Sequence, residues 1–159
     1  MPQNIPGGDR DSSSPVLETA DIRLLAEVAY LGASSPKLFR DTERLFRQLI
    51  FLRPRKAFPY IGLASALLNR QRAEEAAQVM AEGVARQSAD WGSLAPDQEV
   101  FDPIEDPDMM KVFHGLCLLA ARRTAEGQQT LGKLLESCDH PEAIRIARGL
   151  LGFPSGESS

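Results

Sequence analysis

Residues 60–76 read YIGLASALLNRQRAEEA, and this stretch decides how the whole chain is interpreted. Two apolar segments with helical periodicity lie on either side of a polar break at residues 70–72. The small side chains Ala64, Ala76 and, further on, Gly83 recur among larger ones. Small residues let two helices cross closely, while larger residues fill the gaps between them. The pattern therefore predicts a helical hairpin that serves as scaffold, and not the wall of an active site.

Further helices are indicated along the chain, and no segment shows the sustained period-two alternation of a strand. Ser35, Asp106 and Thr124 are predicted helix N-caps. Gly32 is a predicted helix end, and Pro141 a first helical position. The expected fold class is all-α, with helices over residues 21–32, 35–54, 57–70, 73–86, 106–122, 124–137 and 140–152. The face of the first helix that is expected to be buried consists of Ile22, Leu25, Val28 and Ala29.

The same spacing of small and large residues returns in the second half of the chain. Its members there are His114, Gly115, Leu118, Gly127, Leu131 and Leu134. His114 lies 51 positions after Leu63, which is about 17 more than one period of about 34 residues. The extra residues fall between Arg86 and Met109, in a segment rich in Pro, Gly and Asp, so we expect an insertion in a loop.

Both copies resemble the tetratricopeptide repeat, a helix–turn–helix unit of about 34 residues. Tyr60 takes the first aromatic position of that motif, and Leu63 with Ala64 takes its Leu-Gly pair. An earlier repeat is degenerate, because its turn LGASSPKLF is long and Thr42 replaces a small apolar residue. The resemblance implies about three tetratricopeptide-like repeats, with the last helix closing them as a cap.

The expected domain organisation follows from these segments. The start of the chain is rich in Pro, Gly, Ser and Asp and cannot bury enough apolar surface to fold. Residues 1–18 are therefore expected to form a disordered tail. The repeat domain is expected to cover residues 19–151 with an insertion at 87–108, and residues 152–159 are expected to form a flexible tail.

Composition argues against several classes of protein. The chain has 159 residues, 43% of them hydrophobic, and a net charge of −4, so it suits one soluble domain without a positive field for nucleic acid. Its apolar runs IGLASALL and GLCLLAA are shorter than the about 20 residues of a membrane span. The N-terminus lacks the apolar segment of a secretory signal. Two cysteines are too few for a disulfide framework and indicate a reducing, cytosolic compartment.

Residue types for catalysis or metal binding are scarce. The chain contains no nucleophile motif and no Gly-rich phosphate loop, and its two histidines leave little for acid–base catalysis, so we expect neither an enzyme nor a cofactor. Two cysteines and two histidines would suit a tetrahedral zinc ion, but they lack the usual spacing. They are His114, Cys117, Cys138 and His140. Core packing for Cys117 and helix capping for His140 are the favoured roles, with a metal site as the alternative.

Two charged segments need an interpretation. Arg40, Arg44 and Arg47 recur at helical spacing and predict a solvated helix face, with contact to an acidic partner as the alternative. The acidic run DQEVFDPIEDPD at 97–108 lacks the spacing of a calcium loop and is expected to be a solvated insertion. The alternative for this insertion is a contact surface with two aromatic anchors, Trp91 and Phe101.

In a tetratricopeptide array, the first helices of successive repeats line a concave surface that receives a peptide or a helix. The residues at groove-facing positions of this chain are mostly aliphatic, which predicts a groove for the apolar face of a client helix. They are Ile61, Ser65, Leu68, Asn69, Val112, Leu116 and Leu119. The alternative, equally open, is that Leu116 and Leu119 pack against the last helix.

The segment from about residue 20 to 151 resembles the small tetratricopeptide-repeat proteins of bacterial type III secretion clusters, both the needle-subunit chaperone class and the Hrp-associated class. The resemblance is carried by a helix ending in LRP at 52–54, the AEEAAQVM and GLCLLA helices, and the closing DHPEAIRIARGLL. It implies a non-enzymatic chaperone in the bacterial cytoplasm that binds an amphipathic helix of a secreted or needle-type subunit, with a co-chaperone as a further partner. The alternative is a general repeat adaptor or structural assembly protein without a role in secretion.

Overall fold

The computed structural model describes residues 19–88 and 106–154, and within these ranges it contains helices and no strand. The helices are α1 (Thr19–Ala33), α2 (Phe39–Leu52), α3 (Ala57–Asn69), α4 (Ala73–Ser88), α5 (Pro107–Ala120), α6 (Thr124–Ser137) and α7 (Pro141–Leu150). The prediction of an all-α fold is confirmed. Trp91, Phe101, the acidic run up to residue 105 and both expected tails, apart from residues 152–154, lie outside the described residues.

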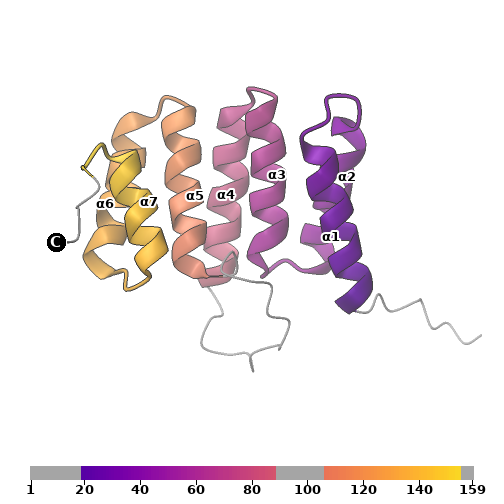
Figure 1. Ribbon diagram of the computed structural model, residues 1–159, viewed down its shortest axis with the longest axis horizontal. Helices are drawn as coiled ribbons and strands as arrows, with labels where there is room; N and C mark the ends of the chain where they lie inside the picture. Colours follow the sequence, from indigo (N-terminus) through magenta and orange to yellow (C-terminus); the bar gives the residue numbers. More distant parts are fainter. Residues whose placement is uncertain (1–18, 89–105, 155–159) are drawn as a thin grey trace, which may run out of the picture.

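The helices stand side by side in one row, from α1 and α2 at one end to α6 and α7 at the other (Figure 1). Neighbours along the chain pack as hairpins, and successive hairpins meet where α2 packs on α3 and α4 on α5. In addition, α1 contacts α3, α3 contacts α5, and α5 contacts α7. Within the described residues, the backbones of α2, α4 and α6 make no such contacts with one another. We call α1, α3, α5 and α7 the odd layer, and α2, α4 and α6 the even layer.

The helical hairpins depend on close crossings at small residues, as the sequence predicts. A Cβ atom added to Gly83 would lie 2.7 Å from Met110 Cε and from Tyr60 Cγ. One added to Gly115 would lie 2.6 Å from two carbons of Leu131. Real Cβ atoms do not approach other atoms so closely, so these crossings need glycine.

Two of the turns between helices share one backbone conformation. Arg72 N donates to Leu67 O over 2.9 Å, and Arg123 N donates to Leu118 O over 2.9 Å. The residue before each of these arginines is left-handed, with φ of 59° at Gln71 and 61° at Arg122. Both α3 and α5 therefore end in a Schellman motif, a hydrogen-bonded turn that stops a helix at a left-handed residue.

Two of the predicted helix caps are confirmed. Asp106 Oδ1 accepts a hydrogen bond of 2.7 Å from Asp108 N, and Pro107 follows it as the first residue of α5. His140 Nδ1 accepts a hydrogen bond of 3.2 Å from Ala143 N at the start of α7.

Other predictions for helix ends are wrong. Thr124 is the first residue of α6 and not its cap, and Ser35 lies in a turn, because α2 begins only at Phe39. Gly32 does not end α1; it is buried inside the helix, where a Cβ atom would overlap the Thr42 hydroxyl. Gly32 thus allows a close approach of α2 to α1, and buried Thr42 fills that place.

The buried face of α1 also differs from the prediction. Ile22 and Ala29 are buried as expected, but Val28 is 52% exposed and Ala26 takes its place in the core. The buried positions recur every three to four residues, which turns the apolar side of α1 away from Val28.

The apolar core consists of two clusters that meet in α5. The larger cluster is formed by α1 to α5 and the smaller one by α5, α6 and α7. Cys117 is buried in the larger cluster, which confirms its predicted packing role. Phe113 is half-buried and packs against both clusters, so it joins the two halves of the row.

Candidate functional site

The seven residues predicted to line a groove all lie on α3 and α5, in the odd layer, but two of them are core residues. Ile61 is 2% exposed in the larger cluster, and Val112 is 1% exposed in the smaller one. Neither side chain offers surface to a partner, so for these two the structure corrects the prediction.

The other predicted positions on α3 lie nearer the surface. Ser65 is half-buried, and its Oγ donates a hydrogen bond of 2.8 Å to Ile61 O. Leu68 is half-buried and packs against the larger cluster. Asn69 is exposed, and its Nδ2 donates over 3.5 Å to Ala33 O, which ties the end of α3 to the end of α1.

The predicted positions on α5 divide between surface and packing. Leu119 is half-buried and packs against the smaller cluster, which includes residues of α7. Its Cδ2 lies where a Cβ atom added to Gly127 would be only 2.7 Å away, so Leu119 faces α6. Leu116 is half-buried and is not among the side chains that pack against either cluster. The odd layer thus presents Leu68, Asn69 and Leu116 at or near its surface.

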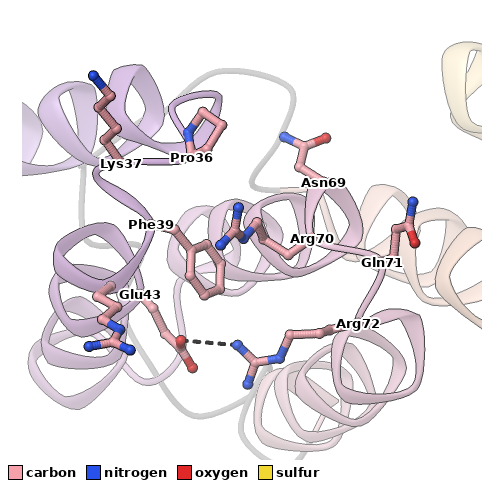
Figure 2. Close-up of a pocket in the computed structure, with 9 residues that line it drawn as sticks. Pro36, Lys37, Phe39, Glu43, Asn69, Arg70, Gln71 and Arg72 are labelled. Carbon is pink, nitrogen blue, oxygen red and sulfur yellow. Dashed lines mark hydrogen bonds and ion pairs between the residues drawn. The ribbon is translucent and has the colours of Figure 1, made fainter.

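A hollow of about 660 Å³ opens where the start of α2 faces the turn between α3 and α4 (Figure 2). We call it the Phe39 pocket. Its lining is rich in cationic and amide side chains and consists of Pro36, Lys37, Phe39, Arg40, Glu43, Asn69, Arg70, Gln71 and Arg72. Sequence reasoning identified Arg40 as part of a basic face and placed Asn69 in the groove, but it treated residues 70–72 only as a polar break.

The Phe39 ring is the centre of this pocket. It is 7% exposed, and two guanidinium groups lie against it, with Arg70 Cζ 5.0 Å and Arg72 Cζ 5.5 Å from the ring centroid. The attraction between a cation and the face of an aromatic ring favours this arrangement. Figure 2 shows Phe39 between Arg70 and the pair formed by Arg72 and Glu43.

All three guanidinium nitrogens of Arg72 donate hydrogen bonds to carboxylates. Its Nε and Nη2 donate to the two carboxylate oxygens of Glu75 over 2.7 and 2.6 Å, and its Nη1 lies 3.3 Å from Glu43 Oε2. The hydrogen bonds from Arg72 hold the pKa of Glu75 below its usual value, and Glu75 in turn raises the pKa of Arg72. Glu43 also accepts a hydrogen bond of 2.9 Å from Arg47.

The same ionic arrangement recurs 51 positions later. Arg123 donates to both oxygens of Glu126, and its Nη1 lies 3.0 Å from Glu74 Oε1. Arg72 and Arg123 therefore link α4 to α2 and α6 to α4, across the even layer. The sequence pattern Arg-x-x-Glu directly after each turn is the feature from which these links could have been predicted.

The remaining cations of the Phe39 pocket lack such partners. Among residues 19–88 and 106–154, no carboxylate lies within ion-pair distance of Lys37, Arg40 or Arg70. The pocket is therefore positive although the chain carries a net charge of −4. Its lining includes no Cys, His, Ser or Thr side chain. Cationic and amide side chains without carboxylate partners are suited to binding an anion.

The cysteines and histidines lie apart from this pocket. Burial raises the pKa of the Cys117 thiol to about 12. Burial, and then the charge of Arg123, lower the pKa of His114, and Glu126 opposes them in part. Cys138 Sγ accepts a hydrogen bond of 3.4 Å from His140 N. In the part of the chain that the structure describes, no three His, Cys, Asp or Glu side chains are grouped to hold a metal ion.

Comparison with known proteins adds no relative. No family model matches the chain, and neither the curated proteins nor the solved structures contain a match to it. The resemblance to tetratricopeptide-repeat proteins therefore stays a prediction from the residues. Of the helices in residues 19–88 and 106–154, none combines the length and the apolar character needed to cross a membrane.

Proposed function

We propose that this chain is a tetratricopeptide-like repeat protein that binds an amphipathic helix of another polypeptide on its odd layer. In this proposal it is a non-enzymatic chaperone of a type III secretion system, acting in the bacterial cytoplasm. Its client is a secreted or needle-type subunit, which it keeps soluble before export. The assignment to secretion rests on the resemblance of the closing DHPEAIRIARGLL and of the other segments named above.

The observation that carries the proposal is the difference between the two layers. Within residues 19–88 and 106–154, successive helices of the odd layer contact one another, whereas those of the even layer are joined through side chains such as Arg72 and Glu43 and not through close backbone contact. Because a row of hairpins is expected to bend toward its more closely packed layer, we assign the odd layer as the inner surface of the array. Curved inner surfaces are the usual binding surfaces of helical-repeat proteins.

Leu68 and Leu116 are the side chains that we assign to the client. They lie on α3 and α5, which contact each other, and both are half-buried. Covering these two side chains with the apolar face of a helix would remove apolar surface from water, which favours binding by roughly 25 cal/mol per Å² of buried surface. Part of this gain is lost in ordering the client, so we expect moderate and reversible binding, as delivery to an export apparatus requires.

The test is co-purification from the native host with the wild-type chain and with the Leu68→Asp/Leu116→Asp double variant. A carboxylate on this surface would have to be desolvated under the client helix, so the double variant should lose the client. Circular dichroism must show that the variant stays helical. The matched control is Ala81→Asp/Gln129→Asp, which adds the same charge to exposed positions of the even layer and should keep the client.

The identity of the captured protein separates the two functions considered. A secretion substrate or needle-type subunit supports the chaperone, while a protein unrelated to export supports the general adaptor. Retention of the client by the Leu68→Asp/Leu116→Asp variant, or its equal loss from the control, would overturn binding on the odd layer.

A further inference from the structure

We propose that the Phe39 pocket is a docking site for an acidic peptide segment, one that presents several carboxylates along an extended backbone. The site lies at one end of the hairpins and shares only Asn69 with the predicted groove. The inference concerns this pocket alone and does not depend on what binds the odd layer.

The first support is the uneven pairing of charge within the pocket. Arg72 donates hydrogen bonds from all three of its guanidinium nitrogens to Glu75 and Glu43, and Glu43 also pairs with Arg47. Arg70 stacks on Phe39 and has no carboxylate within ion-pair distance in the described part of the chain. A ligand carboxylate can therefore bind Arg70 without displacing an existing ion pair.

The second support is that Arg70 is held ready for a ligand. Its guanidinium lies 5.0 Å from the centroid of the Phe39 ring, which restricts the side chain before any partner arrives. Arg70 also directly precedes the left-handed residue of the Schellman turn, Gln71, and its own N–H donates to Leu67 O over 3.0 Å. A guanidinium that is oriented in advance loses less entropy when it binds a carboxylate.

The third support is the shape of the site. About 660 Å³ is within the usual range for ligand sites and far exceeds what one inorganic anion fills. The Lys37 side chain extends away from Arg70 (Figure 2), so the cations are spread along the pocket and do not converge on one point. Spread cations suit successive carboxylates better than one compact phosphate. The exposed amide of Gln71 and the side-chain oxygen of Asn69 can bind a peptide backbone, while Asn69 Nδ2 keeps its hydrogen bond to Ala33 O.

The experiment is a titration of the full-length chain into fluorescein-labelled hexaglutamate, followed by fluorescence anisotropy at low salt. Hexaglutamine with the same label is the neutral comparison. The chain as a whole is negative, so its overall field repels hexaglutamate, and binding must come from a local cationic site. We expect hexaglutamate to bind, hexaglutamine to bind at least about tenfold more weakly, and added salt to weaken the complex.

Two matched variants locate the site. Arg40→Gln/Arg70→Gln removes two exposed cations of the pocket, and we expect at least about a tenfold loss of affinity for hexaglutamate. Arg122→Gln/Arg148→Gln removes two exposed cations elsewhere, and we expect less than about a twofold change. Lys37→Gln, at the rim, should produce a smaller loss than the first pair.

Three outcomes would overturn the proposal. The first is equal weakening by the two double variants, which would mean attraction to total charge. The second is equal binding of hexaglutamine. The third is competition by inorganic phosphate that is as effective, per mole, as competition by unlabelled hexaglutamate, which would make the pocket a phosphate site.

Discussion

At the scale of single residues, Gly115 lies at a close crossing of α5 and α6. A Cβ atom there would lie 2.6 Å from side-chain carbons of Leu131, which is itself fully buried. We predict that Gly115→Ala lowers the free energy of unfolding by about 1–3 kcal/mol, the usual cost of overpacking a core. Urea unfolding followed by circular dichroism measures this.

The control for this variant lies on the facing helix. An added Cβ on Gly132, in α6, would meet no atom within 4 Å apart from its chain neighbours and the backbone of its own helix. Gly132→Ala should therefore raise stability by up to about 1 kcal/mol, because alanine has the better helix propensity. If both alanine variants shifted the urea midpoint in the same direction, the prediction would be wrong, because the close crossing at Gly115 would then not determine the effect of a larger side chain.

At the scale of helices, α5 and α6 share a titratable contact. Burial and the charge of Arg123 lower the pKa of His114 in the folded state, so folding favours the neutral imidazole. In the unfolded chain, the His114 imidazole becomes protonated as the pH falls through about 6.5. As the pH falls from about 6.5 to the lowered folded pKa, the unfolded state binds more protons than the folded state, and stability falls. Below the pKa of His114 in the folded state, both states are protonated, and His114 causes no further loss of stability.

We predict that His114→Gln removes this part of the acid sensitivity. The free energy of unfolding of the variant, measured in urea at several pH values between about 5 and 7.5, should fall less steeply on acidification than that of the wild-type chain. Parallel pH profiles of the two proteins would show that His114 does not contribute to the slope.

Helix ends also show which parts of the fold are predictable from sequence. The caps at Asp106 and His140 depend on residues two or three positions away, so a local pattern is enough to predict them. Gly32 has the residue type of a helix end, but its role depends on Thr42, which approaches from another helix. No local pattern contains that information.

The candidate site was harder to predict for the same reason. Register positions indicated one face of α3 for the groove, but α3 packs against α1, α2, α4 and α5, which buries Ile61 as well. The Phe39 pocket joins residues 36–43 to residues 69–72, and these meet only because α2 packs on α3. Only the cationic character of Arg40 and the exposure of Asn69 were evident from the sequence.

At the scale of the whole molecule, the two core clusters should unfold as coupled but separable units. Phe113 packs against both, and in a row of hairpins each unit is stabilised mainly by its neighbours. We predict that Phe113→Ala costs about 3 kcal/mol and weakens α6 and α7 more than α3 and α4. Hydrogen exchange should show amides of α6 and α7 losing protection first.

Phe153, which is exposed at the end of the row, supplies the control. Phe153→Ala removes the same aromatic side chain and should leave the exchange pattern unchanged. An equal loss of protection in every helix of the Phe113→Ala variant would mean that the row unfolds as a single cooperative unit.

The two layers also differ in the kind of force that holds them. Arg72 and Arg123 link the helices of the even layer through partly exposed ion pairs, which dissolved salt weakens, whereas the helices of the odd layer meet mainly through buried apolar side chains, whose contacts are not screened. A change in ionic strength should therefore affect the contacts between helices of the even layer more than those of the odd layer. Concentrated salt should let the helices of the even layer move apart while every helix stays intact.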